Sequence, residues 1–199
     1  MEVMQKTLQV IRKADPEFKV SLAGNFHKEL EADIYDYCIP IGASYPAEVL
    51  ARRAQNNLPT TYYTCCTEAF PNTFTFSDPA EAAWMSYYSA KDHLDGYLRW
   101  AYNSWPKEPL LDSRFEAWAG GDTYLVYPGA RSSIRFEKLI EGVQAHEKIT
   151  ILRKEFTDKK NKTGFKKLEK MLSTFNLRDF PEVPAAETVN KANKILNSL

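Results

Sequence analysis

The chain has 199 residues and a mass of 22.8 kDa, with 26 basic and 26 acidic side chains that balance to a formal net charge of zero. This charge balance gives no electrostatic reason to expect nucleic acid or an anionic membrane as a partner. Three cysteines and three scattered histidines form neither a disulfide framework nor a metal site by their spacing. No apolar run approaches membrane-spanning length, and the charged first residues do not resemble a signal peptide.

Apolar periodicity and turn residues predict alternating helices and strands over the first hundred residues. We expect helices at 2–13, 46–56 and 78–93, and strands at 18–22, 33–41, 60–67 and 96–102. Strands and helices that alternate at this spacing are typical of a parallel sheet with helical crossovers. The sequence therefore predicts an α/β fold.

The pattern changes after residue 103. A loop rich in Trp, Pro and Gly leads to a short predicted strand at 123–127, and Ser132 or Ser133 then caps a long helix that runs to about residue 156. Two further helices are expected at 164–175 and 185–198. We therefore expect an α/β part at 1–156 and a helical tail at 157–199.

Chain length leaves the architecture of the sheet open. Four strands are predicted within 103 residues, whereas a closed eightfold barrel takes about 250 residues. Four strands make either a small open sheet or half of a barrel, and half of a barrel would leave two unpaired strand edges. The residue pattern alone does not choose between the two.

Aromatic side chains make up 13% of the chain and crowd residues 62–127. Their flat apolar faces and polar tips suit a site for a sugar or a heterocycle as well as they suit a core. The composition alone does not choose between such a site and a core.

Four stretches of the chain together resemble the C-terminal catalytic region of glycoside hydrolase family 123. They are 95–106 (DGYLRWAYNSWP), 121–129 (GDTYLVYPG), 132–137 (SSIRFE), and 61–66 (TYYTCC) followed by Pro71 and Asn72. The likeness covers about residues 1–148, and the tail from about 157 carries no family signature. The resemblance implies the C-terminal half of a (β/α)8 TIM-type barrel, followed by the helical tail.

The resemblance also implies a reaction. Members of the family are β-N-acetylgalactosaminidases with a substrate-assisted retaining mechanism, in which the 2-acetamido oxygen of the substrate attacks the anomeric carbon. An adjacent Asp-Glu pair divides the remaining work: the Asp orients the acetamido group, and the Glu protonates the leaving oxygen. The implied partner is a glycan that contains N-acetylhexosamine, and no metal or organic cofactor is implied.

That acidic pair is missing from this sequence, because no two acidic residues are adjacent anywhere in it. The family places the pair at the end of a strand just before the helix with which this chain opens, so we expect Met1 to lie downstream of it. We therefore expect the chain alone to be catalytically silent. The sequence does not fix its compartment, although the resemblance implies a periplasmic or secreted parent.

Two alternatives to this interpretation stay open. The first is a non-catalytic, truncated carbohydrate-binding or assembly module, which completes an N-terminal half-barrel or associates with itself. The second is a fragment with no independent role.

Candidate substrate-binding residues lie where predicted strands end, because barrel active sites gather at the C-terminal ends of the strands. Trp100, Tyr102, Asn103 and Trp105 stand at the end of the 96–102 strand or just beyond it. An indole face can stack on a pyranose ring, and Asn and Tyr can hydrogen-bond to acetamido or hydroxyl groups. Trp100 suits a core equally well, and Asp122 in its Gly-Gly-Asp turn is expected to be structural first.

The predicted strand at 60–67 contributes further candidates. Tyr62 and Tyr63 alternate, so only one of them faces the barrel axis, and Tyr63 is included as a candidate for sugar contact. Glu68 stands at the correct end for a site carboxylate, with a solvated loop acid as the alternative. Cys65 and Cys66 are expected to be small buried residues rather than nucleophiles.

Overall fold

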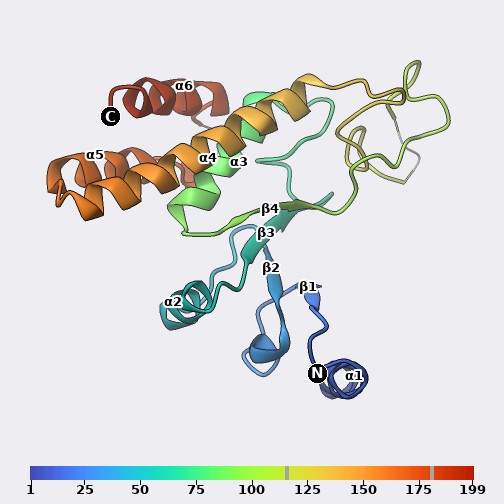
Figure 1. Cartoon of the computed structure of the whole chain (residues 1–199). Coiled ribbons are helices and arrows are strands. Elements are labelled where there is room, and N and C mark those ends of the chain that lie inside the picture. The colour runs from blue at the N-terminus through green and yellow to red at the C-terminus, as the bar shows by residue number, and fades with distance from the viewer. Residues whose placement is uncertain (115–116, 180–181) are drawn as a thin grey trace. The chain divides into compact units, whose positions relative to one another are not determined.

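The computed structural model describes residues 1–114, 117–179 and 182–199, and over these residues it has four strands and six α-helices. The strands are β1 (Ser21–Ala23), β2 (Asp36–Pro40), β3 (Thr60–Thr64) and β4 (Gly96–Arg99). The helices are α1 (Glu2–Ala14), α2 (Ala47–Gln55), α3 (Ala80–Lys91), α4 (Ile134–Asp158), α5 (Lys162–Leu172) and α6 (Ala185–Leu196), with short 3-10 turns at Glu31–Asp33 and Leu177–Asp179. The predicted α/β fold is confirmed (Figure 1).

The four strands form one sheet in the order β1-β2-β3-β4. The pairs β1/β2 and β2/β3 are parallel, with Ser21 opposite Asp36 and Cys38 opposite Thr61. Parallel neighbours need crossover connections, and α2 and α3 provide those between β2 and β3 and between β3 and β4. The predicted alternation of strands and helices is therefore present.

Two strands end earlier than predicted, because the backbone after each one hydrogen-bonds elsewhere. The strand predicted at 60–67 ends at Thr64, and the next amide, that of Cys65, donates to the Glu68 carboxylate at 2.6 Å. The strand predicted at 96–102 ends at Arg99, and the Tyr102 carbonyl accepts from the Leu125 amide at 2.8 Å. The candidate residues beyond position 99 therefore lie in a loop.

The chain divides into two compact units, which we call the sheet unit (residues 1–63 and 94–98) and the helical unit (residues 64–93 and 99–199). The last residue of β3 and the last residue of β4 both belong to the helical unit. The boundary between an α/β part and a tail at residue 157 stays a prediction.

The core of the sheet unit includes two buried side chains of α2, Val49 and Arg53. Tyr37 and Ile39 of β2 and Tyr62 of β3 are fully buried there. The buried Arg53 guanidinium donates to the carbonyls of Ile34, Tyr35 and Pro59 at 2.7–3.0 Å and to the Glu31 carboxylate at 3.2 Å. These bonds offset the cost of burying a charge and fix α2 to the strands.

A row of polar side chains crosses three strands of the sheet unit. Asp36 of β2 accepts from the Ser21 hydroxyl of β1 at 3.3 Å and from the Thr61 hydroxyl of β3 at 3.0 Å. Since side chains alternate across a strand, this row lies opposite the face that carries Tyr37 and Tyr62. The sheet therefore has one apolar face and one partly polar face.

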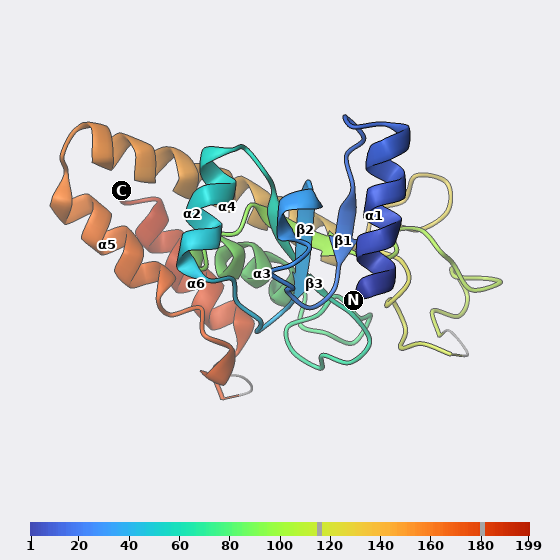
Figure 2. The same cartoon turned by 90° about the horizontal axis from the view of Figure 1, so that it is seen from below.

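The core of the helical unit surrounds α3. Every residue from Ala80 to Ala90 is buried, and α3 contacts α4, α5 and α6 (Figures 1 and 2). The Tyr87 ring stacks on Phe175 with 4.5 Å between centroids.

The predicted cap of the long helix is confirmed, since the Ser133 hydroxyl accepts from the Phe136 amide. None of the helices in the described residues has the length and apolarity to cross a membrane.

Candidate functional site

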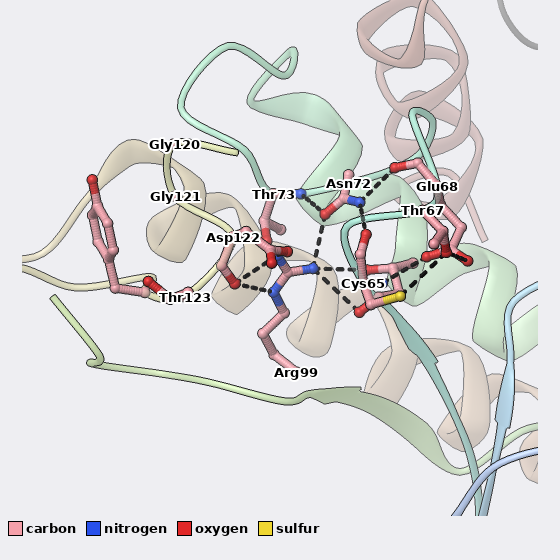
Figure 3. Close-up of polar contacts among 12 residues, drawn as sticks. Cys65, Thr67, Glu68, Asn72, Thr73, Arg99, Gly120, Gly121, Asp122 and Thr123 are labelled. Carbon is pink, nitrogen blue, oxygen red and sulfur yellow. Dashed lines mark hydrogen bonds and ion pairs between the residues drawn. The ribbon is translucent and has the colours of Figure 1, made fainter. Parts of the chain in front are cut away.

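Arg99, the last residue of β4, is the centre of a buried polar network in the helical unit (Figure 3). Its Nη1 donates to the Asn72 side-chain oxygen at 2.8 Å and to the Thr64 hydroxyl at 3.1 Å. Its Nε and Nη2 donate to the Asp122 carbonyl at 3.1 and 2.8 Å, and Nη2 also pairs with the Asp122 carboxylate. One guanidinium thus joins the ends of two strands to two loops.

Asn72 ties together the loop that follows β3 through hydrogen bonds at both ends of its side-chain amide. Its side-chain nitrogen donates to the carbonyls of Cys65 at 2.8 Å and Glu68 at 2.7 Å. Its side-chain oxygen accepts from Arg99 and from the Thr73 amide at 2.8 Å. A buried amide with both ends paired fixes its surroundings, because each lost bond would leave a buried polar group without a partner.

Asp122 follows a turn that requires glycine. Gly121 has φ +82°, and its carbonyl accepts from the buried Arg135 guanidinium at 3.1 Å. Arg135 also donates to the carbonyls of Thr73 and Tyr124, and burial lowers its pKa. Two buried guanidiniums therefore hold the Asp122 turn, which agrees with the structural role expected for Asp122.

Glu68 lies in the loop that Asn72 holds, and it is half-buried. Its carboxylate accepts from the Cys65 amide and from the Thr67 hydroxyl, both at 2.6 Å. The expectation that both cysteines after β3 are buried is wrong: Cys66 is exposed and Cys65 is half-buried. The reason is that β3 ends before them, so neither side chain points into a layer of the sheet.

Trp100, Tyr102, Asn103 and Trp105 are all exposed on the segment after β4. This segment pairs antiparallel with the segment that follows Asp122. The Asn103 backbone bridges to Tyr124, and the Ser104 amide donates to the Thr123 carbonyl at 3.0 Å. The strand predicted at 123–127 is thus reduced to one side of a short ribbon.

The four exposed side chains differ in how they are held. The Trp105 indole N–H donates to the Val126 carbonyl at 2.7 Å, and the Tyr102 ring meets the Phe136 ring at 5.7 Å between centroids. The Asn103 amide makes no side-chain hydrogen bond to any residue that the structure describes. Trp100 contacts another indole, that of Trp118, with 5.6 Å between centroids.

The sequence analysis missed Trp118 and Arg99. Trp118 lies in a long loop without periodicity, and only the general crowding of aromatic residues pointed to it. Arg99 stands inside a motif that was singled out, but its role depends on partners 23 to 35 residues away in the sequence. Tyr63, the sixth candidate, lies half-buried in the sheet unit, whereas the other five lie in the helical unit.

No group of three or more His, Cys, Asp or Glu side chains in the described part of the chain is placed to hold a metal ion. The ionisable side chains around Arg99 form hydrogen bonds and ion pairs that fix the neighbouring loops. The aromatic and amide side chains of Trp100, Tyr102, Asn103 and Trp105, beyond β4, are exposed instead.

Comparison with known proteins decides the family. Residues 1–152 match the family described as glycoside hydrolase 123, catalytic domain. The chain belongs to glycoside hydrolase family 123. The resemblance seen in the motifs, over about residues 1–148, is thereby confirmed.

A solved structure supports the same assignment. The structure of a family 123 glycoside hydrolase from Clostridium perfringens, reported for its hydrolysis of glycolipid glycans, matches with a TM-score of 0.78 and 26% sequence identity. The match covers 100% of this chain and 38% of that one, so the family 123 chain described here spans well under half the length of its structural relative. A comparison with curated proteins found no match.

Proposed function

We propose that this chain forms the C-terminal portion of a glycoside hydrolase that removes terminal β-linked N-acetylgalactosamine by a substrate-assisted retaining mechanism. One observation carries the proposal: in a chain of family 123, the segment after β4 exposes three aromatic rings and an amide in one run. Sugar sites combine a few apolar faces with a few polar groups that fix orientation. The run from Trp100 to Trp105 provides both.

The proposed role of these residues is to position the substrate. In the mechanism, the acetamido oxygen must approach the anomeric carbon while the leaving oxygen takes a proton. Aromatic faces at Trp100, Tyr102 and Trp105 would hold the ring, and the Asn103 amide would hydrogen-bond to the acetamido group, which supports a near-attack geometry. Glu68 is a further proposed substrate-binding residue, since its carboxylate retains acceptor capacity beside its two present bonds. Tyr63, which belongs to the sheet unit, stays a candidate for sugar contact through the family resemblance alone.

The acid that protonates the leaving oxygen is proposed to lie outside this chain. Because no two acidic residues are adjacent, the sequence supplies no Asp-Glu pair. The buried acids near the site do not replace it, because Asp122 is paired with Arg99 and Glu81 accepts hydrogen bonds from the backbone at the start of α3. We therefore expect binding of the sugar without turnover.

This proposal is tested by combining an activity assay with a binding assay on the isolated chain. A chromogenic N-acetyl-β-galactosaminide should not be hydrolysed, whereas N-acetylgalactosamine should bind and Asn103→Ala should weaken that binding. The matched control is Asn190→Ala, which removes an exposed amide on α6 in the same unit. Hydrolysis by a preparation free of host glycosidases would contradict the expected silence, and equal binding by the two variants would contradict the role of Asn103.

We also propose that the sheet is half of an eight-stranded barrel. Four strands in sequential order, with parallel pairing and helical crossovers, support this architecture. The order leaves β1 and β4 at the edges, where each strand has one neighbour within the sheet. A barrel would pair both edges with four further strands.

The second candidate function is that of an assembly module, and the exposed apolar side chains of α1 in the sheet unit favour it. Val3 and Val10 are 76% and 68% exposed, so apolar side chains of this helix face water. The relative from Clostridium perfringens matches this whole chain over only 38% of its own length. Additional chain of the kind that this relative has is one occupant that would cover the apolar face of α1. A second copy could cover it instead.

Sedimentation separates these two occupants. A mass that rises with protein concentration, and returns to that of the monomer in a Val3→Lys, Val10→Lys double variant, would favour self-association. The control is Val143→Lys, which changes an exposed valine of α4. A constant monomer mass would rule out a second copy as the occupant.

A further inference from the structure

Trp100 and Trp118 form an exposed pair of indoles in the helical unit. Their ring centroids lie 5.6 Å apart and their planes meet at 64°, and the side chains are 47% and 41% exposed. Large aromatic side chains normally bury most of their surface, so two that touch and stay open offer apolar area to a ligand. The pair forms a corner with two differently oriented walls.

The backbone near both walls is fixed by the buried network. Trp100 follows Arg99 directly, and Trp118 stands four residues before Asp122, the ion-pair partner of Arg99. Between Trp118 and Asp122, the Asp122 amide donates to the Ala119 carbonyl at 2.9 Å, and the Gly120 carbonyl accepts from the Thr75 amide at 2.8 Å. Anchors of this kind lower the conformational entropy that a binding surface loses when a ligand docks.

We propose that Trp118 is a carbohydrate-binding residue and that, with Trp100, it forms a corner for one N-acetylated hexosamine ring. The indole face of Trp100 would stack on the CH-rich face of the pyranose, and the indole of Trp118, the second wall, would contact the acetamido methyl group. The inference rests on the proposed function, which includes Trp100 but assigns nothing to Trp118. It adds a reason for selectivity, since a hexose without the acetamido group leaves the second wall without a contact.

The chemistry of the corner favours a neutral sugar over other ligands. The guanidinium of Arg99, which precedes Trp100, is buried, and among the described residues it donates hydrogen bonds to Asp122, Asn72 and Thr64. It therefore offers no charge to a phosphate. The Asn103 amide is exposed three residues after Trp100 and can donate and accept hydrogen bonds. Two apolar walls with a neutral amide nearby match a pyranose that carries an amide of its own.

The four tryptophans make a direct test possible, because each indole N–H gives its own signal in a ¹⁵N-correlated NMR spectrum. Titration with N-acetylgalactosamine should shift the signals of Trp100 and Trp118 and leave that of Trp84, which is buried in α3, unchanged. Galactose should bind roughly fivefold more weakly, as expected for the loss of one apolar contact of about 1 kcal/mol.

Variants assign the effect to Trp118. Trp118→Ala should weaken N-acetylgalactosamine binding by about tenfold, and Trp118→Phe should restore most of it. The matched control is Phe165→Ala, which removes an exposed ring on α5 in the same unit and should leave affinity unchanged. Retained thermal midpoints would show that the variants remain folded.

The outcomes separate this inference from the proposed function. If wild type binds the sugar and Trp118→Ala binds it equally well, the corner is wrong while the proposed function stands. If Trp118→Ala weakens galactose and N-acetylgalactosamine alike, the assignment of the second wall to the acetamido methyl is wrong. If N-acetylgalactosamine shifts no indole signal of the wild-type chain, sugar binding at this surface fails as a whole, and an apolar protein contact would explain the exposed pair.

Discussion

The guanidinium of Arg99 and the carboxylate of Asp122 form an ion pair in which the side chains are 4% and 0% exposed. The pair joins the end of β4 to the turn after Gly120 and Gly121; the exposed Trp100 directly follows Arg99, and the exposed Trp118 lies four residues before Asp122. One carboxylate oxygen of Asp122 has no hydrogen-bond partner among the described residues. Because burying two charges is costly, the pair acts more as a constraint on the two loops than as a source of stability.

Removal of one charge from this pair should destabilise the chain strongly. Asp122→Asn keeps the shape of the side chain but leaves the Arg99 guanidinium buried without its counter-charge. Such losses cost about 3–5 kcal/mol in the free energy of unfolding. Urea denaturation measures this as a lower midpoint.

The control for this variant is Asp112→Asn, which breaks the pair between Asp112 and Arg114, whose side chains are 49% and 86% exposed. Exposed pairs of this kind contribute little to stability. If the urea midpoints of Asp122→Asn and Asp112→Asn lie equally close to that of wild type, the buried pair does not constrain the fold.

Local sequence signals predicted the regular elements well, because periodicity and capping act over a few residues. The α2 and α3 helices and the four strands all lie within their predicted ranges or close to them. The ends of β3 and β4 were predicted too late, since they depend on competing partners such as the Glu68 carboxylate for the Cys65 amide. A residue pattern does not contain that competition.

The site was predicted only in part for the same physical reason. The exposed residues from Trp100 to Trp105 were found through the family motif and the chemistry of their side chains. Arg99 was not, because its role exists only when Thr64, Asn72 and Asp122 converge on it. Trp118 lies in a loop whose path is set by contacts such as that of Gly120 with Thr75, which no local rule predicts.

Gly121→Ala should be more harmful than a glycine replacement in an ordinary turn. A Cβ at this position would overlap the Arg135 guanidinium and lie 2.8 Å from the Thr75 backbone nitrogen, and φ is +82°. The left-handed conformation costs about 1 kcal/mol for alanine, and crowding against a fixed backbone adds about 1–3 kcal/mol. Thermal or urea unfolding reports the sum.

Gly129→Ala is the matched control, with φ +75° and only the exposed, flexible Arg131 guanidinium near the added carbon. The difference between the two variants isolates the crowding around Gly121. Equal losses would mean that the Gly121 turn can move away from Arg135.

Glu81 should make stability depend on pH in the direction opposite to that of a carboxylate in a salt bridge. The side chain is buried at the start of α3, and burial raises its pKa above the ordinary 4.5 although two backbone amides donate to it. The folded state therefore holds the proton more tightly than the unfolded state. Its contribution to stability is present below pH 4.5 and is lost as pH rises through the raised pKa.

The measurement is the free energy of unfolding of wild type and Glu81→Gln between pH 4 and 8. The advantage of wild type over the variant should shrink as pH rises and then become constant above the raised pKa. Parallel curves over the whole range would show that the pKa of Glu81 is the same in the folded and unfolded states.

The three cysteines should react with iodoacetamide in the order of their exposure. Cys38 is buried in β2, and burial raises the pKa of its thiol to about 11, so very little of it is thiolate at pH 8. Burial also raises the pKa of Cys66, but that side chain is exposed in the loop after β3. We expect native labelling at Cys66 and protection of Cys38 until the chain unfolds, as followed by peptide mass spectrometry. Cys66→Ser should remove the fast label. If the fast label persists in that variant, the reactive thiol is Cys65 or Cys38, which would contradict the exposed position of Cys66.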